Sequence, residues 1–85
     1  MNFPAEDAAR RLLRVTTQLV QETHPSRQSP VTLDSPLERD LGLDSLARVE
    51  LLLRLGREFG ASLPEAALAE AETPRALLAF LGHAA

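Results

Sequence analysis

Apolar residues recur along most of the chain with the spacing of amphipathic α-helices. A first helix is predicted from about Pro4 to Glu22, a second from Ser45 to about Phe59, a third from Pro64 to Glu70 and a last one from Pro74 to Leu81. Strand-like alternation and internal repeats are both lacking in the sequence. The pattern therefore predicts an all-α fold, a four-helix bundle with a long first loop and a short third helix.

Proline and glycine mark the expected ends of these helices. His24-Pro25 should end the first helix, because proline cannot continue a helix and its predecessor avoids helical angles. Gly60 should end the second helix in a left-handed conformation, and Gly82 should lie beyond the last. Thr73-Pro74 is typical of a helix start, with threonine as the cap and proline in the first turn.

The predicted loop between the first two helices is unusually long. Within it, Ser35-Pro36-Leu37-Glu38 fits a capping box and predicts a short helical turn through about Asp40. Leu37 and Leu41 can then anchor the loop to the core. Because long connections in compact domains are usually functional, the loop directs attention to the residue on which it ends, Ser45.

The second helix has two apolar sides when it is drawn at 3.6 residues per turn. One side holds Leu51, Leu52, Leu55 and Phe59, and the other holds Leu46, Val49 and Leu53. If the first side faces the core, the second is an exposed apolar strip, and such strips often mark partner surfaces. Burial of both sides in so small a bundle is the alternative.

Length and charge narrow the class of protein further. The chain has 85 residues, and residues 1–85 are expected to form one domain. The net charge of −3 and the absence of a basic run argue against nucleic acid or an anionic membrane as the main partner. The chain has no cysteine, no recognisable signal peptide and no apolar run of bilayer length, so a reducing cytoplasm is expected. His24 and His83 lack metal-ligand spacing and are expected at the surface, so no metal site is predicted.

Asp44 and Ser45 stand where the loop meets the second helix. Asp44 is a good N-cap, because its carboxylate can accept hydrogen bonds from the free N–H groups of the first turn. Ser45 then occupies the first helical position, near the positive end of the helix dipole, where a phosphate ester on its oxygen is tolerated or stabilised. Capping alone is the alternative explanation of an Asp-Ser pair.

The segment 35–53, SPLERDLGLDSLARVELLL, resembles the signature of acyl carrier proteins, and the resemblance extends from about Ala8 to Leu81. It implies that Ser45 carries a 4′-phosphopantetheine arm, derived from coenzyme A, whose thiol holds acyl groups as thioesters. It also implies a non-catalytic, monomeric protein served by a phosphopantetheinyl transferase, an acyl-AMP ligase or other adenylating enzyme, and ketosynthase, acyltransferase or condensation enzymes. The segment is most similar to carriers that follow fatty-acyl-AMP ligases in polyketide and nonribosomal peptide assembly lines.

Two neighbouring groups of residues are expected to bind partners. The recognition helix of the family corresponds to the second helix here, so the resemblance favours partner binding by Leu46, Val49 and Leu53. On the same helix Arg48, Arg54 and Arg57 are expected to select a partner that carries acidic groups. The acidic residues Glu38 and Asp40 in the preceding loop, beside Asp44, are expected to contribute. The arginines depart from the strongly acidic helix of the carriers of fatty-acid synthesis.

Other functions remain as alternatives. A peptidyl carrier of nonribosomal peptide synthesis is the second interpretation, and a carrier of primary fatty-acid metabolism is the third. A small helical interaction module, in which the apolar strip docks a partner helix, belongs to a different class. A serine hydrolase is disfavoured, because the sequence has no G-x-S-x-G elbow.

Overall fold

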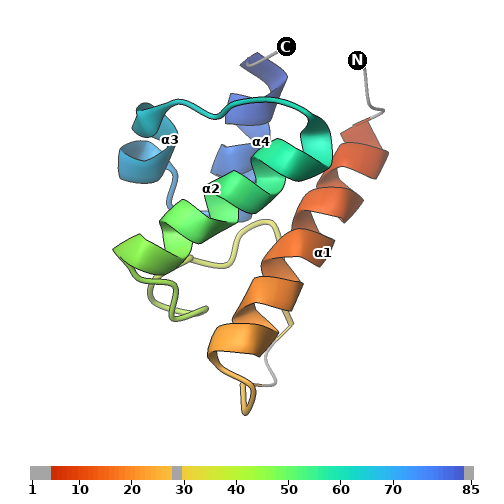
Figure 1. Ribbon diagram of the computed structural model, residues 1–85. Coiled ribbons are helices and arrows are strands. Elements are labelled where there is room, and N and C mark those ends of the chain that lie inside the picture. Colours follow the sequence, from red (N-terminus) through yellow and green to blue (C-terminus); the bar gives the residue numbers. More distant parts are fainter. Residues whose placement is uncertain (1–4, 28–29, 84–85) are drawn as a thin grey trace.

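The computed structural model describes residues 5–27 and 30–83, and within them it contains helices and no strand. The helices are α1 (Ala5–Thr23), α2 (Ser45–Phe59), α3 (Glu65–Glu70) and α4 (Pro74–His83) (Figure 1). The predicted all-α architecture with a long first loop and a short third helix is thereby confirmed. None of the helices in the described ranges combines the length and apolar character needed to cross a bilayer.

The helices pack around one core. α1 contacts α2 and α4, and α3 contacts the same two helices from another side (Figure 1). All four helices and the long loop contribute buried apolar side chains: Leu12, Val15, Leu19, Val20, Leu37, Leu41, Leu43, Leu51, Leu55, Ala67, Ala71 and Leu77. The loop is therefore part of the core, although its described residues form no helix.

Three leucines fasten the loop to the bundle. Leu37 and Leu41 are buried as predicted, and Leu43, two residues before Ser45, is fully buried as well. The Leu43 N–H donates to the Leu37 carbonyl at 2.9 Å, which folds the intervening residues into a compact turn. The last anchor therefore lies immediately before the start of α2.

The loop is also bonded to the connection between α3 and α4. The Leu37 N–H donates to the Glu72 carbonyl, and the Arg75 N–H donates to the Leu33 carbonyl, both at 2.9 Å. The Arg75 guanidinium also forms two hydrogen bonds, of 2.9 and 3.0 Å, with the Asp34 carboxylate. This pairing lowers the pKa of Asp34 chiefly through the hydrogen bonds from Arg75.

His24 holds the part of the loop that contains Gly42. Its ring Nε2 lies 2.9 Å from the Gly42 carbonyl, to which it can donate, and Arg27 donates to the neighbouring Asp40 carbonyl. The expectation that His24 is a surface residue was wrong, because the ring is half-buried against this backbone. The side chain of His83 lies outside the described residues.

Several predicted helix ends are confirmed and others are shifted. Gly60 ends α2 with φ of 63°, and the Thr73 hydroxyl accepts from the Ala76 N–H at 3.2 Å. α3 begins at Glu65, because Pro64 is extended and occupies the cap position. The expectation that Gly82 lies beyond α4 was wrong; glycine also adopts right-handed helical angles, and the helix continues through it to His83.

The segment that begins at Ser35 forms a turn of a different kind from the capping box that was predicted. The N–H groups of Asp40 and Gly42 donate to the carbonyls of Pro36 and Glu38, at 3.0 and 3.1 Å, so helical hydrogen bonds are present. The Ser35 hydroxyl, however, accepts from the Thr32 N–H at 3.0 Å, on its N-terminal side. It therefore stabilises the entrance to the turn.

The two apolar sides of α2 predict opposite mutational effects. Leu55 is fully buried, so Leu55→Ala should cost about 2–5 kcal/mol of unfolding free energy through lost packing. Leu53 is 53% exposed, and Leu53→Ala should change the unfolding free energy by no more than about 0.5 kcal/mol. Urea denaturation of both variants checks the expectation, and equal losses would contradict the assignment of the two sides.

Two glycines with left-handed backbone angles provide a matched test of the contact between His24 and the loop. Gly42 and Gly60 have φ of 67° and 63°, so an alanine at either position is strained by about 1–2 kcal/mol. A Cβ at Gly42 would also lie 2.7 Å from His24 Nε2, whereas open space surrounds a Cβ at Gly60. Gly42→Ala should therefore be less stable than Gly60→Ala by about 1 kcal/mol, the value of the displaced hydrogen bond.

The contribution of the His24 contact is isolated by measuring the urea midpoints of the two glycine variants again in a His24→Ala background. The difference between the variants should disappear in that background. A difference that persists without the histidine ring would show that the strain at Gly42 has another source.

Candidate functional site

The candidate site is the N-terminus of α2. Asp44 is extended, with φ of −76° and ψ of −175°, and its Oδ1 accepts from the Ala47 N–H at 2.9 Å. The prediction that Asp44 is the N-cap is confirmed. Ser45 is consequently the first residue of the helix, and its side chain is exposed.

The Ser45 hydroxyl is suited to carry a phosphodiester. Asp44 satisfies the N–H of Ala47, so the N–H groups of Ser45 and Leu46 point out of the helix end without an intrahelical acceptor. Together with the helix dipole they favour negative charge at this position. An exposed oxygen on a firmly held backbone leaves room for a long flexible group, so the geometry fits 4′-phosphopantetheine.

The apolar strip of Leu46, Val49 and Leu53 follows directly along α2. These are the large apolar side chains exposed in the described part of the chain, with exposures of 79%, 39% and 53%. Leu51 and Leu55 are fully buried, and Leu52 and Phe59 pack partly against them. The predicted division of the helix is thus confirmed, whereas the binding of partners by the strip stays a prediction.

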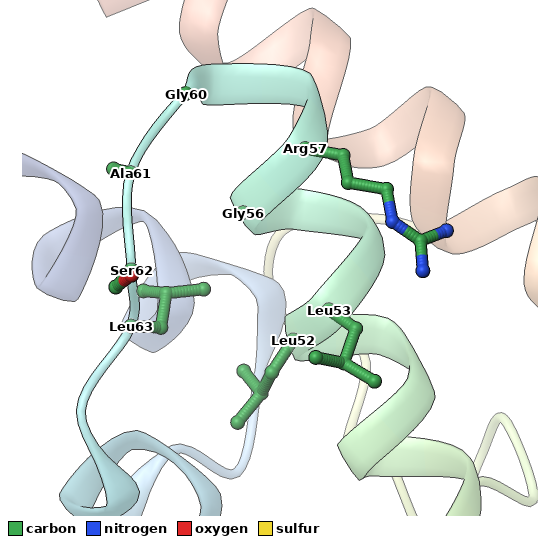
Figure 2. A pocket seen from close by; sticks show the side chains of 8 residues that line it. All are labelled: Leu52, Leu53, Gly56, Arg57, Gly60, Ala61, Ser62 and Leu63. Atoms are coloured by element: carbon green, nitrogen blue, oxygen red, sulfur yellow. The ribbon is translucent and has the colours of Figure 1, made fainter.

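A shallow groove continues from the strip toward the end of α2. It is lined by Leu52, Leu53, Gly56, Arg57, Gly60, Ala61, Ser62 and Leu63. Figure 2 shows that Leu52 and Leu63 lie on facing walls, whereas the Arg57 side chain extends away from the Ala61–Leu63 wall. The groove is therefore lined mainly by apolar residues, with one cationic group at its edge.

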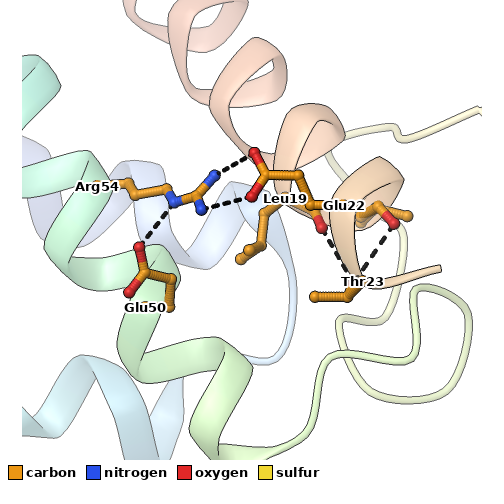
Figure 3. Close-up of polar contacts among 6 residues, drawn as sticks. Leu19, Glu22, Thr23, Glu50 and Arg54 are labelled. Carbon is orange, nitrogen blue, oxygen red and sulfur yellow. Dashed lines mark hydrogen bonds and ion pairs between the residues drawn. The ribbon is translucent and has the colours of Figure 1, made fainter. Parts of the chain in front are cut away.

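Arg54 lies in a different environment from the one predicted for a partner-binding arginine. Its guanidinium donates to both carboxylate oxygens of Glu22 on α1, at 2.9 and 2.7 Å, and to Glu50 one turn earlier, at 2.8 Å (Figure 3). The hydrogen bonds with Glu22 and then Glu50 raise the pKa of Arg54, and those from Arg54 lower the pKa of Glu22. Arg54 thus connects α2 to α1, and reversing its charge would disturb this packing.

The other two arginines of α2 differ from each other in exposure. Arg57 is exposed, in agreement with a partner-binding role. The Arg48 side chain is only 18% exposed, with Nη1 lying 3.5 Å from the Ala71 carbonyl and Nη2 lying 4.0 Å from Glu38. Arg57 is therefore the arginine among the three that is most available to a partner.

The acidic residues collect before the serine as predicted. Glu38, Asp40 and Asp44 are all exposed, with Arg39 exposed among them. The structure therefore places an acidic loop on one side of Ser45 and the apolar strip on the other. Their use by partners stays a prediction.

Sequence reasoning missed the residues that hold the site in place. His24, Glu22 and Asp34 act through contacts with residues that are distant in the sequence, at Gly42, Arg54 and Arg75 respectively. Leu43 was missed as well, although its fully buried side chain lies only two residues before Ser45.

Comparison with known proteins identifies the family of this chain. The family described as "Phosphopantetheine attachment site" matches residues 11–81. The chain is 36% identical over 73 residues to the actinorhodin polyketide synthase acyl carrier protein of Streptomyces coelicolor, covering 86% of this chain and 84% of that protein. It is also 36% identical over 63 residues to an acyl carrier protein of Treponema pallidum, covering 74% of this chain and 81% of that protein.

A further relative has a higher identity over a shorter segment. The anthracycline acyl carrier protein DpsG of Streptomyces peucetius is 46% identical over 50 residues, which are 59% of this chain and 60% of that protein. The match thus spans somewhat less than two thirds of that carrier. Taken together with the family match over most of the chain, these similarities show that the chain belongs to the phosphopantetheine-binding family of acyl carrier proteins.

Proposed function

We propose that this protein carries acyl intermediates as thioesters on a 4′-phosphopantetheine arm attached to Ser45. The observation that carries the proposal is the exposed serine at the first position of α2, with its backbone held by the Asp44 cap and by the buried loop leucines. In the attachment step the Ser45 oxygen forms a bond to the phosphorus of the phosphopantetheinyl group of coenzyme A. The bond between that phosphorus and the bridging oxygen of the diphosphate breaks, adenosine 3′,5′-bisphosphate leaves, and the hydroxyl proton is released.

The arm and the protein have separate tasks. The arm supplies the reactive thiol, which this chain cannot supply because it contains no cysteine. The protein supplies the attachment oxygen, a helix end that favours the phosphodiester charge, and a surface that enzymes recognise. We therefore infer a non-catalytic carrier, and we expect it to act in the cytoplasm as a monomer without a metal site.

Polyketide biosynthesis is the pathway that the similarities favour. One relative is named for actinorhodin polyketide synthase and another for anthracyclines, and both names point to a cargo of polyketide type. The expected partners are a phosphopantetheinyl transferase, a ketosynthase or acyltransferase, and an acyl-AMP ligase if the resemblance to ligase-associated carriers extends to loading. A peptidyl carrier served by condensation enzymes is the alternative.

Partner recognition is assigned to two surfaces around Ser45. We expect the enzymes to contact the strip of Leu46, Val49 and Leu53, because apolar side chains exposed together on one helix favour docking. The acidic loop with Glu38 and Asp40 and the exposed Arg57 would select partners by charge. Arg54, which is bonded to α1, is better explained as a structural residue.

Attachment can be tested by intact mass. Incubation with coenzyme A and a broad-specificity phosphopantetheinyl transferase should add one phosphopantetheinyl group to the wild type and none to Ser45→Ala. Ser62→Ala, which changes another exposed serine, is the control and should be modified normally. Peptide mapping that places the group on any serine other than Ser45 would contradict the proposal.

Charge selection can be tested at Arg57. Arg57→Glu should slow loading by the cognate acyl-loading enzyme several-fold at low salt, because reversing an exposed charge slows encounter, and the effect should shrink as salt is added. The unfolding free energy should stay within about 0.5 kcal/mol of the wild type, since the side chain is exposed.

The control for this experiment is Arg10→Glu, which reverses an exposed charge on α1. It should leave the loading rate nearly unchanged. Equal loading rates of wild type and Arg57→Glu at low salt would show that partner selection lies elsewhere.

A further inference from the structure

Arg48 has a partly buried side chain whose guanidinium has few hydrogen-bond partners. Its Nε is buried and has no acceptor within the described part of the chain. The two contacts of its terminal nitrogens are long, at 3.5 Å to the Ala71 carbonyl and 4.0 Å to Glu38. The ion pairs of Arg54 and Arg75, by contrast, span 2.7–2.9 Å. Arg48 therefore retains donors that an additional oxygen can satisfy.

The position of Arg48 connects these donors to the attachment site. Arg48 lies three residues after Ser45, so the two side chains project from the same side of α2. Helical side chains lean toward the N-terminus of their helix, which directs Arg48 back toward the serine. Its two weak partners lie in the loop before the site and at the end of α3, which places the guanidinium between these segments.

The surroundings of Arg48 also allow an exchange of partners. Glu38 is 76% exposed, so water can replace Arg48 as its partner at little cost. The buried Nε–H has no such replacement, and an unpaired buried donor is destabilising. An oxygen brought to this position by the arm would therefore bind the guanidinium without breaking a strong interaction.

We propose that Arg48 is a positioning residue that donates hydrogen bonds to an oxygen acceptor of the Ser45-linked arm, an inference that rests on the proposed function. The acceptor is either the phosphodiester of the arm or a carbonyl of the acyl group that it carries. Planar guanidinium groups suit both, because they donate through a fixed fork to phosphate and carboxyl-type oxygens. Arg48 thereby holds the arm against the α2–α3 side of the protein.

The competing explanation is that Arg48 only fastens the end of α3 to α2 through the Ala71 carbonyl. In that case its environment would not depend on the arm. The two explanations therefore differ in what happens to the Arg48 Nε–H when the arm and then the cargo are attached.

The direct measurement is NMR of the Arg48 Nε–H in arginine-labelled protein, in its unmodified, phosphopantetheinylated and acylated forms. Hexanoyl and 3-oxohexanoyl groups provide acyl chains of the same length with and without the additional carbonyl. The Nε–H should shift and should exchange with water about tenfold more slowly once its acceptor is present. Intact mass verifies modification of each sample, so a failure of the proposed function is seen separately as a missing mass increase.

A substitution provides the second readout. Arg48→Lys keeps the charge and loses the Nε–H and the fork. The wild type should gain thermal stability when the arm or the oxo-acyl group is attached, and Arg48→Lys should lose most of this gain. Arg10→Lys, at an exposed position on α1, should keep it. The gain is compared within each variant, so a general destabilisation by the lysine does not affect the result.

Each outcome decides the proposal. A change on attachment of the arm alone supports it and identifies the phosphodiester as the acceptor. A change that appears with the 3-oxohexanoyl group but not with the hexanoyl group supports the proposal. It identifies the additional acyl carbonyl as the acceptor. An Nε–H that is the same in all forms, with equal stability gains in wild type and Arg48→Lys, would overturn it.

Discussion

The burial of Leu37, Leu41 and Leu43 is the constraint on which the position of Ser45 depends. The described part of the loop forms turns and no helix, so its path is set by these side chains and by individual hydrogen bonds such as that between His24 and the Gly42 carbonyl. Because Leu43 is buried two residues before Ser45, the N-terminus of α2 has a fixed position even though the serine itself faces solvent. A rigid backbone beneath an exposed hydroxyl is the combination that a flexible prosthetic arm requires.

The core and the apolar strip share one helix without sharing residues. Leu51 and Leu55 are buried against the bundle, whereas Leu46 and Leu53 are exposed on another side of α2. The charged residues are divided in a similar way, because Arg54 bonds to α1 and Arg57 faces solvent. The contrast between neighbouring arginines shows that residue type and helix position alone do not separate a charge bonded within the protein from one that faces solvent.

Local features of the site were predictable from the sequence, and its long-range contacts were not. The apolar periodicity predicted the positions of the helices and the two sides of α2. The Asp44 cap followed from the preference of helix N-termini for short polar side chains such as aspartate. The links between Arg54 and Glu22 and between Arg75 and Asp34 join residues 32 and 41 positions apart, and such pairs depend on how the helices pack. For the same reason the half-buried position of Arg48 was not apparent, since it is created by the end of α3 and the loop.

The exposed strip also has a consequence for how proteins of this kind diversify. Since Leu46, Val49 and Leu53 contribute little to the buried core, mutations there escape the selection that folding imposes on Leu51 and Leu55. A duplicated copy of such a protein can therefore acquire a new recognition surface through single substitutions, each of them nearly neutral for folding, while the loop and its serine stay unchanged. Separate biosynthetic routes within one cell can in this way use carriers of the same fold without exchanging their intermediates.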